Sequence, residues 1–508
     1  MKKIISLVGS CFLLCFSSLT FGQNSIPAQK TLTFEDALFI TKENNLLMKK
    51  ADEKTKQMER EKRAARGLYF PTISVNASYV FMSDDIDLDL NPVKDAISPV
   101  YEALGNYGNF SDVPNPDPTT SGTMPYLPDD LSTEMVRQQF QNGLSQIESE
   151  DWNKTIQKKQ FGTISAGFTL PIYTGGKIKT ANKAAEIKTE EANIESKLEL
   201  DKLSCELIER YYGLVLAKQA QIIREDVEKI MYAHLTDAGK MMKEGIIPKA
   251  EFLHAKVYHS DALRELKKIN RKVVILNDAL LNTLAIDEET VIMPVSNLFH
   301  IENLQAIEYF WNKASEKNQI LNKIEKKKEL SHQAYKLEKA EFFPSIAAIG
   351  TYNLYNQDLS PYIPDYAVGV GMKLNLFTGN ERYNKLKAAK HQEKQADIFY
   401  RKTEQDIKTA ITKYYQELNM NLEQLKELDS ALEFALEYAR VREQAFKEGM
   451  ATTTEVSDAN LAVAKVKIEQ LEVLYQYDVA LSKLLYYAGI TDQFSTYTMS
   501  DQSVFKSL

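Results

Sequence analysis

The sequence is poor in cysteine and in side chains arranged for chemistry. Of its three cysteines, Cys11 and Cys15 fall in the N-terminal apolar run, so only Cys205 remains once that run is removed. No intrachain disulfide can then form, and a lone thiol in an exported protein is most simply a small buried side chain. The six histidines show no metal-ligand spacing, and no Ser/His/Asp set can be inferred. We therefore predict no enzyme, no metal site and no cofactor.

Long apolar runs are also missing beyond the N-terminus. Lys2 and Lys3 precede an apolar run over 4–19, and Thr20-Phe21-Gly22 resembles a cleavage site, which predicts a signal peptide over 1–22. No later run reaches the roughly 18 apolar residues of a transmembrane helix. An exported chain can still cross a membrane as a β-barrel, whose sequence pattern is weaker. The net charge of −8 disfavours a nucleic-acid partner.

Glycine and proline are absent from 381–448, where apolar residues recur at steps of three and four. This pattern predicts a helix of roughly 100 Å, which is too long for a compact core and must lie against other long helices. A tip over 449–452 ends it, and Thr452 with Glu455 forms a capping box for a return helix over 453–488. Two apolar seams on that helix are typical of a neighbour on each side.

The same unit occurs earlier in the chain, at an offset of 204 residues. A long helix over 177–244 leads to a tip over 245–248 and a return helix over 249–284. The helices that precede each copy end at Phe-Pro, at residues 70–71 and 343–344. We predict an internal duplication. The first repeat covers 23–300 and begins with a helix from 33 to about 68. The second repeat covers 301–490 and begins with a helix over 303–341. A tail over 491–508 follows.

Four segments alternate between apolar and small or polar residues, which is the period of a strand with two unlike faces. They form two hairpins, over 71–172 and 345–377, with strands expected at 72–81, 161–172, 345–355 and 366–376. The first hairpin has a long loop over 82–160, rich in Pro, Asp, Asn and Gly, with one amphipathic helix over 131–149. The turns between strands and helices are expected at Pro71, Gly175, Gly176, Pro344 and Gly379.

Strands of about ten to twelve residues can span a bilayer when tilted. Four of them cannot enclose a water-filled pore, and open strand edges are not tolerated in lipid. Several copies must therefore contribute four strands each to one barrel, which the helices continue as a tube. The predicted fold class is an α+β membrane protein, with a helical barrel built from coiled coils and four strands per chain in a shared transmembrane β-barrel.

This ordered set of features resembles the TolC family of outer-membrane efflux channels over essentially the whole mature chain. In each copy, a helix ends at Phe-Pro and is followed by a strand, and a later strand leads through Thr-Gly into the long helix. The long helices end at the tips Glu-Gly-Ile and Glu-Gly-Met. The resemblance implies a homotrimer whose twelve strands lie in outer-membrane lipid and whose helices extend into the periplasm of a Gram-negative-type envelope. It implies a periplasmic adaptor (membrane fusion) protein and an inner-membrane transporter of RND or ABC type as partners. It also implies passive conduction outward in a tripartite efflux or type I-like secretion system.

The resemblance also assigns roles to residues. Adaptor docking falls on the tips, at Glu244, Gly245, Ile246, Glu448, Gly449 and Met450. A gate or selectivity ring falls on Glu455 and Asp458, although Glu455 is equally explained as a capping-box residue. The first copy has Glu251 and His254 at the equivalent positions, so only one tip carries the acidic pair. Ala451 and Phe446 replace the arginine and tyrosine with which some family members lock the mouth.

A second function class fits the long helices alone. The chain could be a secreted coiled-coil surface scaffold or adhesin without a pore. Four half-apolar strands argue against this alternative, because a scaffold does not need them.

Overall fold

The computed structural model describes residues 29–106, 114–126, 131–286, 290–499 and 503–505, so the predicted signal peptide over 1–22 lies outside the described residues. The chain forms two compact units. We call them the helical unit, from Met1–Lys62, Lys183–Tyr335 and Lys387–Leu508, and the strand unit, from Arg63–Asn182 and Lys336–Leu386.

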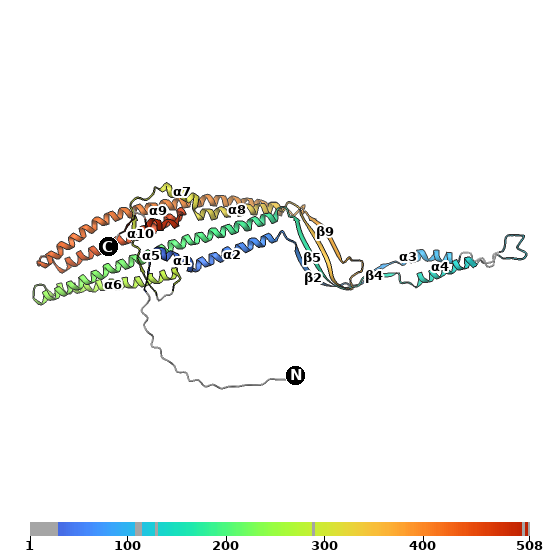
Figure 1. Cartoon of the computed structure of the whole chain (residues 1–508), viewed down its shortest axis with the longest axis horizontal. Helices are drawn as coiled ribbons and strands as arrows, with labels where there is room; N and C mark the ends of the chain where they lie inside the picture. Colours follow the sequence, from blue (N-terminus) through green and yellow to red (C-terminus); the bar gives the residue numbers. More distant parts are fainter. Residues whose placement is uncertain (1–28, 107–113, 127–130, 287–289, 500–502, 506–508) are drawn as a thin grey trace, which may run out of the picture. The chain divides into compact units, whose positions relative to one another are not determined.

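The helical unit holds two long hairpins of matched length. Their first helices, α5 (Lys177–Lys243) and α9 (Glu381–Lys447), begin in the strand unit and have 67 residues each. The return helices, α6 (Lys249–Leu284) and α10 (Thr453–Ala488), have 36 residues each. The glycine-free and proline-free run over 381–448, together with the same unit 204 residues earlier, therefore predicted these four helices to within one residue. Both hairpin turns lie at the same end of this unit (Figure 1).

The helices that precede the hairpins are each broken, which the sequence analysis did not predict. Instead of one helix from 33 to about 68, the structure has α1 (Phe34–Asn44) and α2 (Leu46–Gly67). Instead of one helix over 303–341, it has α7 (Ile307–Lys317) and α8 (Gln319–Ala340). Asn45 and Asn318 stand at the breaks, in extended backbone conformations.

These two asparagines make the same bonds. The Nδ2 of Asn45 donates to the Thr283 carbonyl at 2.9 Å, and that of Asn318 donates to the Tyr487 carbonyl at 2.6 Å. Each Oδ1 accepts the backbone N–H two residues later, at 2.8 Å. Each break therefore caps the next helix and joins it to a return helix. The two asparagines are 273 positions apart in the sequence, as are the two Phe-Pro motifs. The residues whose carbonyls they bind are 204 positions apart, as are the two tips.

The core of the helical unit contains an aromatic cluster among its aliphatic side chains. Ring centroids 5.3 to 6.3 Å apart connect five buried side chains, which are Phe34, Tyr211, Tyr212, Phe299 and Phe494. Two short sheets flank them: β1 (Gln29–Leu32) pairs in parallel with β6 (Val291–Pro294), and β7 (Phe299–Ile301) pairs antiparallel with β10 (Ser503–Phe505). Beyond α10, a 3-10 turn (Thr491–Gln493) and α11 (Phe494–Thr498) complete this core.

Cys205 is buried in α5, as predicted. It is 3% exposed, and its Sγ lies 3.6 Å from the Ser482 carbonyl of α10. Burial raises the pKa of the thiol to about 12. Because the thiolate is the reactive form, this cysteine is a packing residue.

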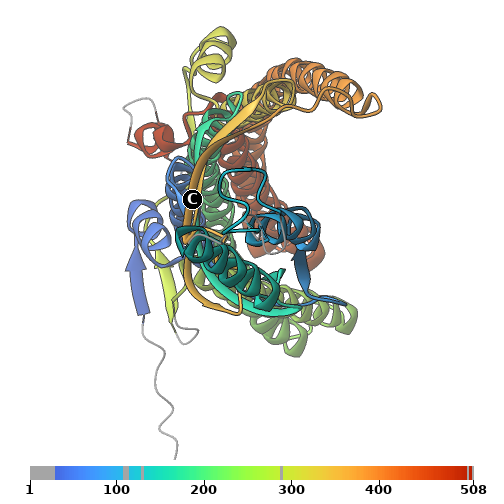
Figure 2. The ribbon, with the colours of Figure 1, turned by 90° about the vertical axis from the view of Figure 1, so that its right-hand side faces the viewer.

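The strand unit is built on one antiparallel sheet with the order β2-β5-β8-β9. Its strands are β2 (Thr72–Phe81), β5 (Gln160–Tyr173), β8 (Ser345–Gln357) and β9 (Tyr366–Lys373), so β9 ends three residues before the predicted Leu376. They lie side by side and follow a curved path (Figures 1 and 2). Within the part of the chain that the structure describes, β2 and β9 each have one strand neighbour, so the sheet has two open edges.

The loop expected over 82–160 is more ordered than predicted. A two-stranded stem, β3 (Ile86–Asp89) and β4 (Asn153–Gln157), leads into α3 (Asn91–Gly105) and α4 (Leu131–Ser149). Only α4 was expected. Proline-rich sequence usually indicates a loop, but Pro92 stands in the first turn of α3, where the missing N–H costs nothing.

Candidate functional site

The two faces of the sheet differ in character, as the alternation predicted. Residues directly opposite one another in the register share a face, and Ile73, Phe168, Gly350 and Val368 lie in one such row. This apolar face includes exposed Val75, Phe81, Val370 and Met372. The other face carries smaller or more polar side chains, which include Thr72, Ser74, Asn76, Thr163, Ser165 and Lys373.

The predicted strand-to-helix turns adopt left-handed backbone conformations. Gly175, Gly176 and Gly379 have φ values of 64°, 93° and 61°. A Cβ on Gly175 would lie 2.7 Å from the Phe343 Cβ, so this glycine also allows close approach to the end of α8. Pro71 and Pro344 directly precede β2 and β8. Lys177, at the start of α5, forms an ion pair with Glu341 at 2.7 Å.

The tip glycines close their helices in the same way. Gly245 and Gly449 have φ values of 71° and 72°. The N–H of Ile246 donates to the Met241 carbonyl at 2.9 Å, and the N–H of Met450 donates to the Ala445 carbonyl at 2.8 Å. Both tips are therefore Schellman caps. Ile246 and Met450 are 61% and 70% exposed, so each tip presents one apolar side chain beside its glutamate, Glu244 or Glu448.

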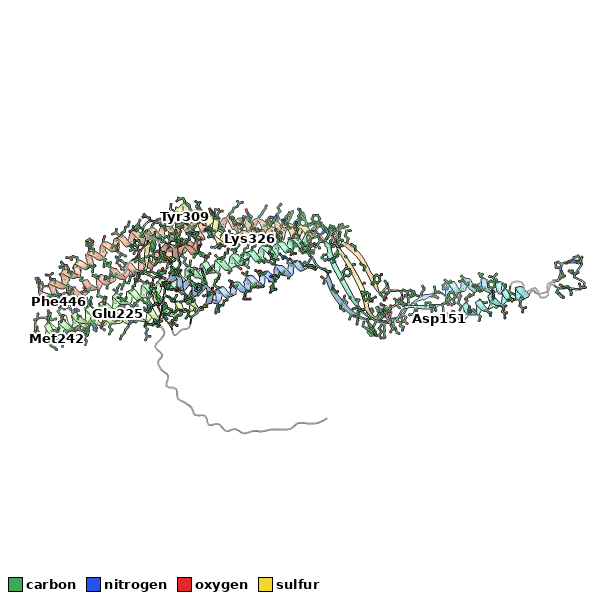
Figure 3. All side chains as sticks on the ribbon, in the orientation of Figure 1. Asp151, Glu225, Met242, Tyr309, Lys326 and Phe446 are labelled. Carbon is green, nitrogen blue, oxygen red and sulfur yellow. The ribbon has the colours of Figure 1, made fainter. Side chains whose placement is uncertain are left out.

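A groove of about 460 Å³ runs between the two hairpins near their tips. Its lining includes the edge-to-face pair of His234 on α5 and Phe446 on α9, with ring centroids 5.6 Å apart. Burial lowers the pKa of His234. Figure 3 shows Met242 and Phe446 at this same end of the helical unit. The walls carry both charges and include Asp237, Lys240, Glu244, Glu443 and Lys447.

Glu455 has the capping role that the sequence offered as its simpler explanation. Its Oε2 accepts the Thr452 backbone N–H at 2.8 Å, and the Thr452 hydroxyl accepts the N–H of Glu455 at 3.2 Å. These bonds to Thr452, the backbone N–H first, lower the pKa of Glu455. Its Oε1 also lies 3.4 Å from Arg442 of α9. The first tip has no such box, because the residue that precedes α6 is Pro248, whose side chain makes no capping hydrogen bond.

Asp458 is exposed and has a partner that the sequence analysis missed. The Tyr258 hydroxyl donates to its Oδ1 at 2.9 Å. Tyr258 lies on α6 and Asp458 on α10, so this bond joins the two hairpins near their tips. Burial, followed by the bond to Asp458, raises the pKa of Tyr258. The bond joins residues 200 positions apart, and no local pattern in the sequence marks Tyr258.

Within the described ranges, no three His, Cys, Asp or Glu side chains are grouped closely enough to hold a metal ion. Over the same ranges, no helix has the length and apolar character needed to cross a membrane.

Comparisons with known proteins agree with this geometry. Residues 311–489 match the model of the family described as outer membrane efflux protein. A membrane protein from Pseudomonas aeruginosa has the same fold, with 11% identity, a TM-score of 0.68 and 90% of each chain covered. The outer membrane protein VceC from Vibrio cholerae (13% identity, TM-score 0.65) matches over 90% of this chain and 96% of its own. The CmeC outer membrane channel of Campylobacter jejuni (10% identity, TM-score 0.66) matches over 92% and 89%. No curated protein matches the chain.

Proposed function

We propose that this chain, an outer membrane efflux protein of the TolC family, forms a homotrimeric duct that conducts substrates passively to the exterior. The family is one of outer-membrane transport channels rather than enzymes. The observation that carries the proposal is the four-stranded sheet, which has one exposed apolar face and two open edges.

The sheet supports threefold assembly because a single copy leaves it incomplete. Backbone groups at a free edge would be unsatisfied in lipid, so β9 of one copy must pair with β2 of the next. Three copies then close a barrel of twelve strands, with the apolar face toward lipid and the small or polar face toward water. The exposed apolar face of the sheet also disfavours the alternative of a secreted scaffold without a pore, because in that protein nothing would shield this face from water.

The helical hairpins would continue the duct into the periplasm. We take the matched helix lengths and the paired asparagine breaks to reflect an internal duplication, with the repeats over 23–300 and 301–490. The exposed Ile246 and Met450 and the mixed charge of the groove make the tips suitable for docking a periplasmic adaptor. An inner-membrane transporter of RND or ABC type would supply the energy.

Trimer assembly tests this proposal directly. The full chain in outer-membrane extracts should migrate as a trimer without heating and as a monomer after boiling. Val368→Arg places a charge on the apolar face of β9 at a cost of about 2 kcal/mol or more in lipid, and should reduce the trimer recovered. Ala367→Arg, the adjacent residue on the other face, is the matched control. A detergent-indifferent soluble monomer would refute the duct.

Asp458 and Glu455 are proposed as a cation-favouring ring at the periplasmic mouth. Asp458→Asn should reduce cation over anion selectivity in single-channel recordings by up to about tenfold at low salt. Glu455→Gln should reduce it less, because Glu455 is held in the cap of α10. Asp458→Glu, which keeps the charge, is the control. Unchanged selectivity and multivalent-cation block in Asp458→Asn would exclude the ring.

A further inference from the structure

The insertion between β2 and β5 is held firmly at its stem. The Gln157 side chain of β4 donates from Nε2 to the Asp358 carbonyl at 2.8 Å and accepts the Ser360 N–H at Oε1 at 2.7 Å. Lys158 adds an ion pair with Asp358 at 2.6 Å. Gln157 is 8% exposed. The stem is a separate two-stranded sheet, but these bonds to the β8–β9 turn anchor it to the four-stranded sheet. It is therefore a fixed base for the helices it carries.

One face of α3 packs on α4. The rings of Tyr101 and Phe140 meet edge to face with centroids 5.7 Å apart. A Cβ on Gly143 would lie 2.9 Å from the Tyr101 ring, so glycine lets that ring lie against α4. Gln141 donates to the Gly105 carbonyl at 3.3 Å. This face accounts for the contact between the two helices of the insertion.

Among the described residues of the insertion, none covers a second face of α3 in this way. Val93, Ile97, Val100 and Leu104 follow one another at steps of four, three and four, so they form one apolar stripe along the helix. Val93, Val100 and Leu104 are 45%, 53% and 38% exposed. The stripe lies about a quarter turn from the face that packs on α4.

The spacing of this stripe is that of a coiled-coil seam. Steps of four, three and four place Val93 and Val100 at d positions and Ile97 and Leu104 at a positions of the heptad. A β-branched residue at d, with Ile or Leu at a, shifts parallel coils from dimers toward trimers and tetramers. Copies related by a threefold axis present α3 in parallel, so this choice of residues suits the assembly proposed above.

We propose that the α3 stripes of three copies pack together into a short parallel coiled coil beyond the outer end of the strands. This inference rests on the proposed function, because it takes the threefold assembly as given. The proposed coil adjoins the interface proposed for the sheet, because the insertion that carries α3 begins directly after the edge strand β2.

The distribution of charge is compatible with this packing. Residues 82–160 contain 14 acidic and 5 basic residues, but α3 and α4 hold only four of the acidic and two of the basic ones. The two acids of α3, Asp95 and Glu102, lie on the side opposite the stripe by helical spacing. Pro99 also lies away from the stripe. Repulsion between copies therefore falls mainly outside the seam.

Two heptads are too few to associate strongly in water by themselves. The fixed stem removes this difficulty, because tethering three helices to one barrel makes their association intramolecular, at an effective concentration in the millimolar range. The coil would form only in the assembled channel.

Cysteine cross-linking tests the coil in the full chain in its membrane. After signal removal Cys205 is the only native thiol, and it is buried. Val100→Cys, treated with a short bismaleimide, should give covalent dimers and trimers that persist after boiling. Glu102→Cys, on the opposite side of the same helix, should stay monomeric after boiling. Val93→Cys repeats the test if Val100→Cys does not reach the membrane.

The outcomes separate this inference from the proposed function. A heat-modifiable trimer in which Val100→Cys yields no covalent product, or in which Glu102→Cys links equally well, overturns the coil and leaves the duct intact. Products whose yield falls when the membranes are diluted with lipid come from contacts between separate trimers, which also overturns it. Loss of the heat-modifiable trimer in the native chain would overturn the duct itself, and the coil with it.

Discussion

Gly489→Ala is expected to lower the free energy of unfolding of the helical unit by about 4 kcal/mol. Gly489 ends α10 in a left-handed conformation with φ 74°. A Cβ there would lie 2.7 Å from both the Cα and the N of Asn318. These are backbone atoms at the break between α7 and α8, where Asn318 is 1% exposed, so they cannot move aside as a side chain would.

The first helical hairpin supplies the control for this substitution. Ala285 occupies the equivalent position 204 residues earlier, with φ 51°. The protein therefore tolerates alanine at this cap where the neighbouring backbone leaves room, and Ala285→Gly should stabilise it by about 1 kcal/mol. Both variants can be compared by urea unfolding of the detergent-solubilised protein, followed by helical circular dichroism. If Gly489→Ala lowers the free energy of unfolding by no more than Ala285→Gly raises it, the cost comes from the left-handed backbone alone. The proposed clash with Asn318 would then be wrong.

The elements most accurately predicted are those whose ends are fixed locally. The two long helices run between glycine turns, and α10 begins at a capping box of Thr452 and Glu455, so residues within one turn determine each boundary. The strands were predicted from the alternation of apolar and polar residues, which is also a local pattern. The register of the sheet places the predicted apolar residues on one face. At this level the sequence was sufficient.

The features missed depend on contacts between distant residues. Asn45 breaks a helix because its side chain reaches a carbonyl 238 residues away, and nothing beside it in the sequence marks that bond. Tyr258 was missed as the partner of Asp458 for the same reason. α3 was missed because its prolines resemble a loop. The roles of the tips and of Asp458 in docking and gating remain predictions, since they concern surfaces between chains.

Asp478→Asn is expected to remove a large pH dependence of stability. Asp478 lies on α10, is 0% exposed, and lies near Tyr212 and Phe299 of β7. Burial raises its pKa well above the usual 3.8, and a hydrogen bond with the Phe299 backbone opposes this only in part. The folded protein therefore holds a proton that the unfolded chain releases above about pH 4. Native stability should fall with rising pH by about 1.4 kcal/mol per unit, until the folded pKa is passed.

The comparison of variants isolates this carboxyl from other groups. Asp201, whose pKa burial raises to about 6, gives a slope of the same sign between about pH 4 and 6 in both proteins, so it cancels in the difference. The urea midpoints of Asp478→Asn and the native chain should diverge steadily from pH 5 to 7, with the variant favoured at the higher pH. Asp261→Asn, at an exposed ion pair with Arg264, should follow the native curve. Parallel curves for Asp478→Asn and the native chain would mean that Asp478 is ionised in the fold. Its burial would then have to be balanced by polar contacts stronger than the one from Phe299.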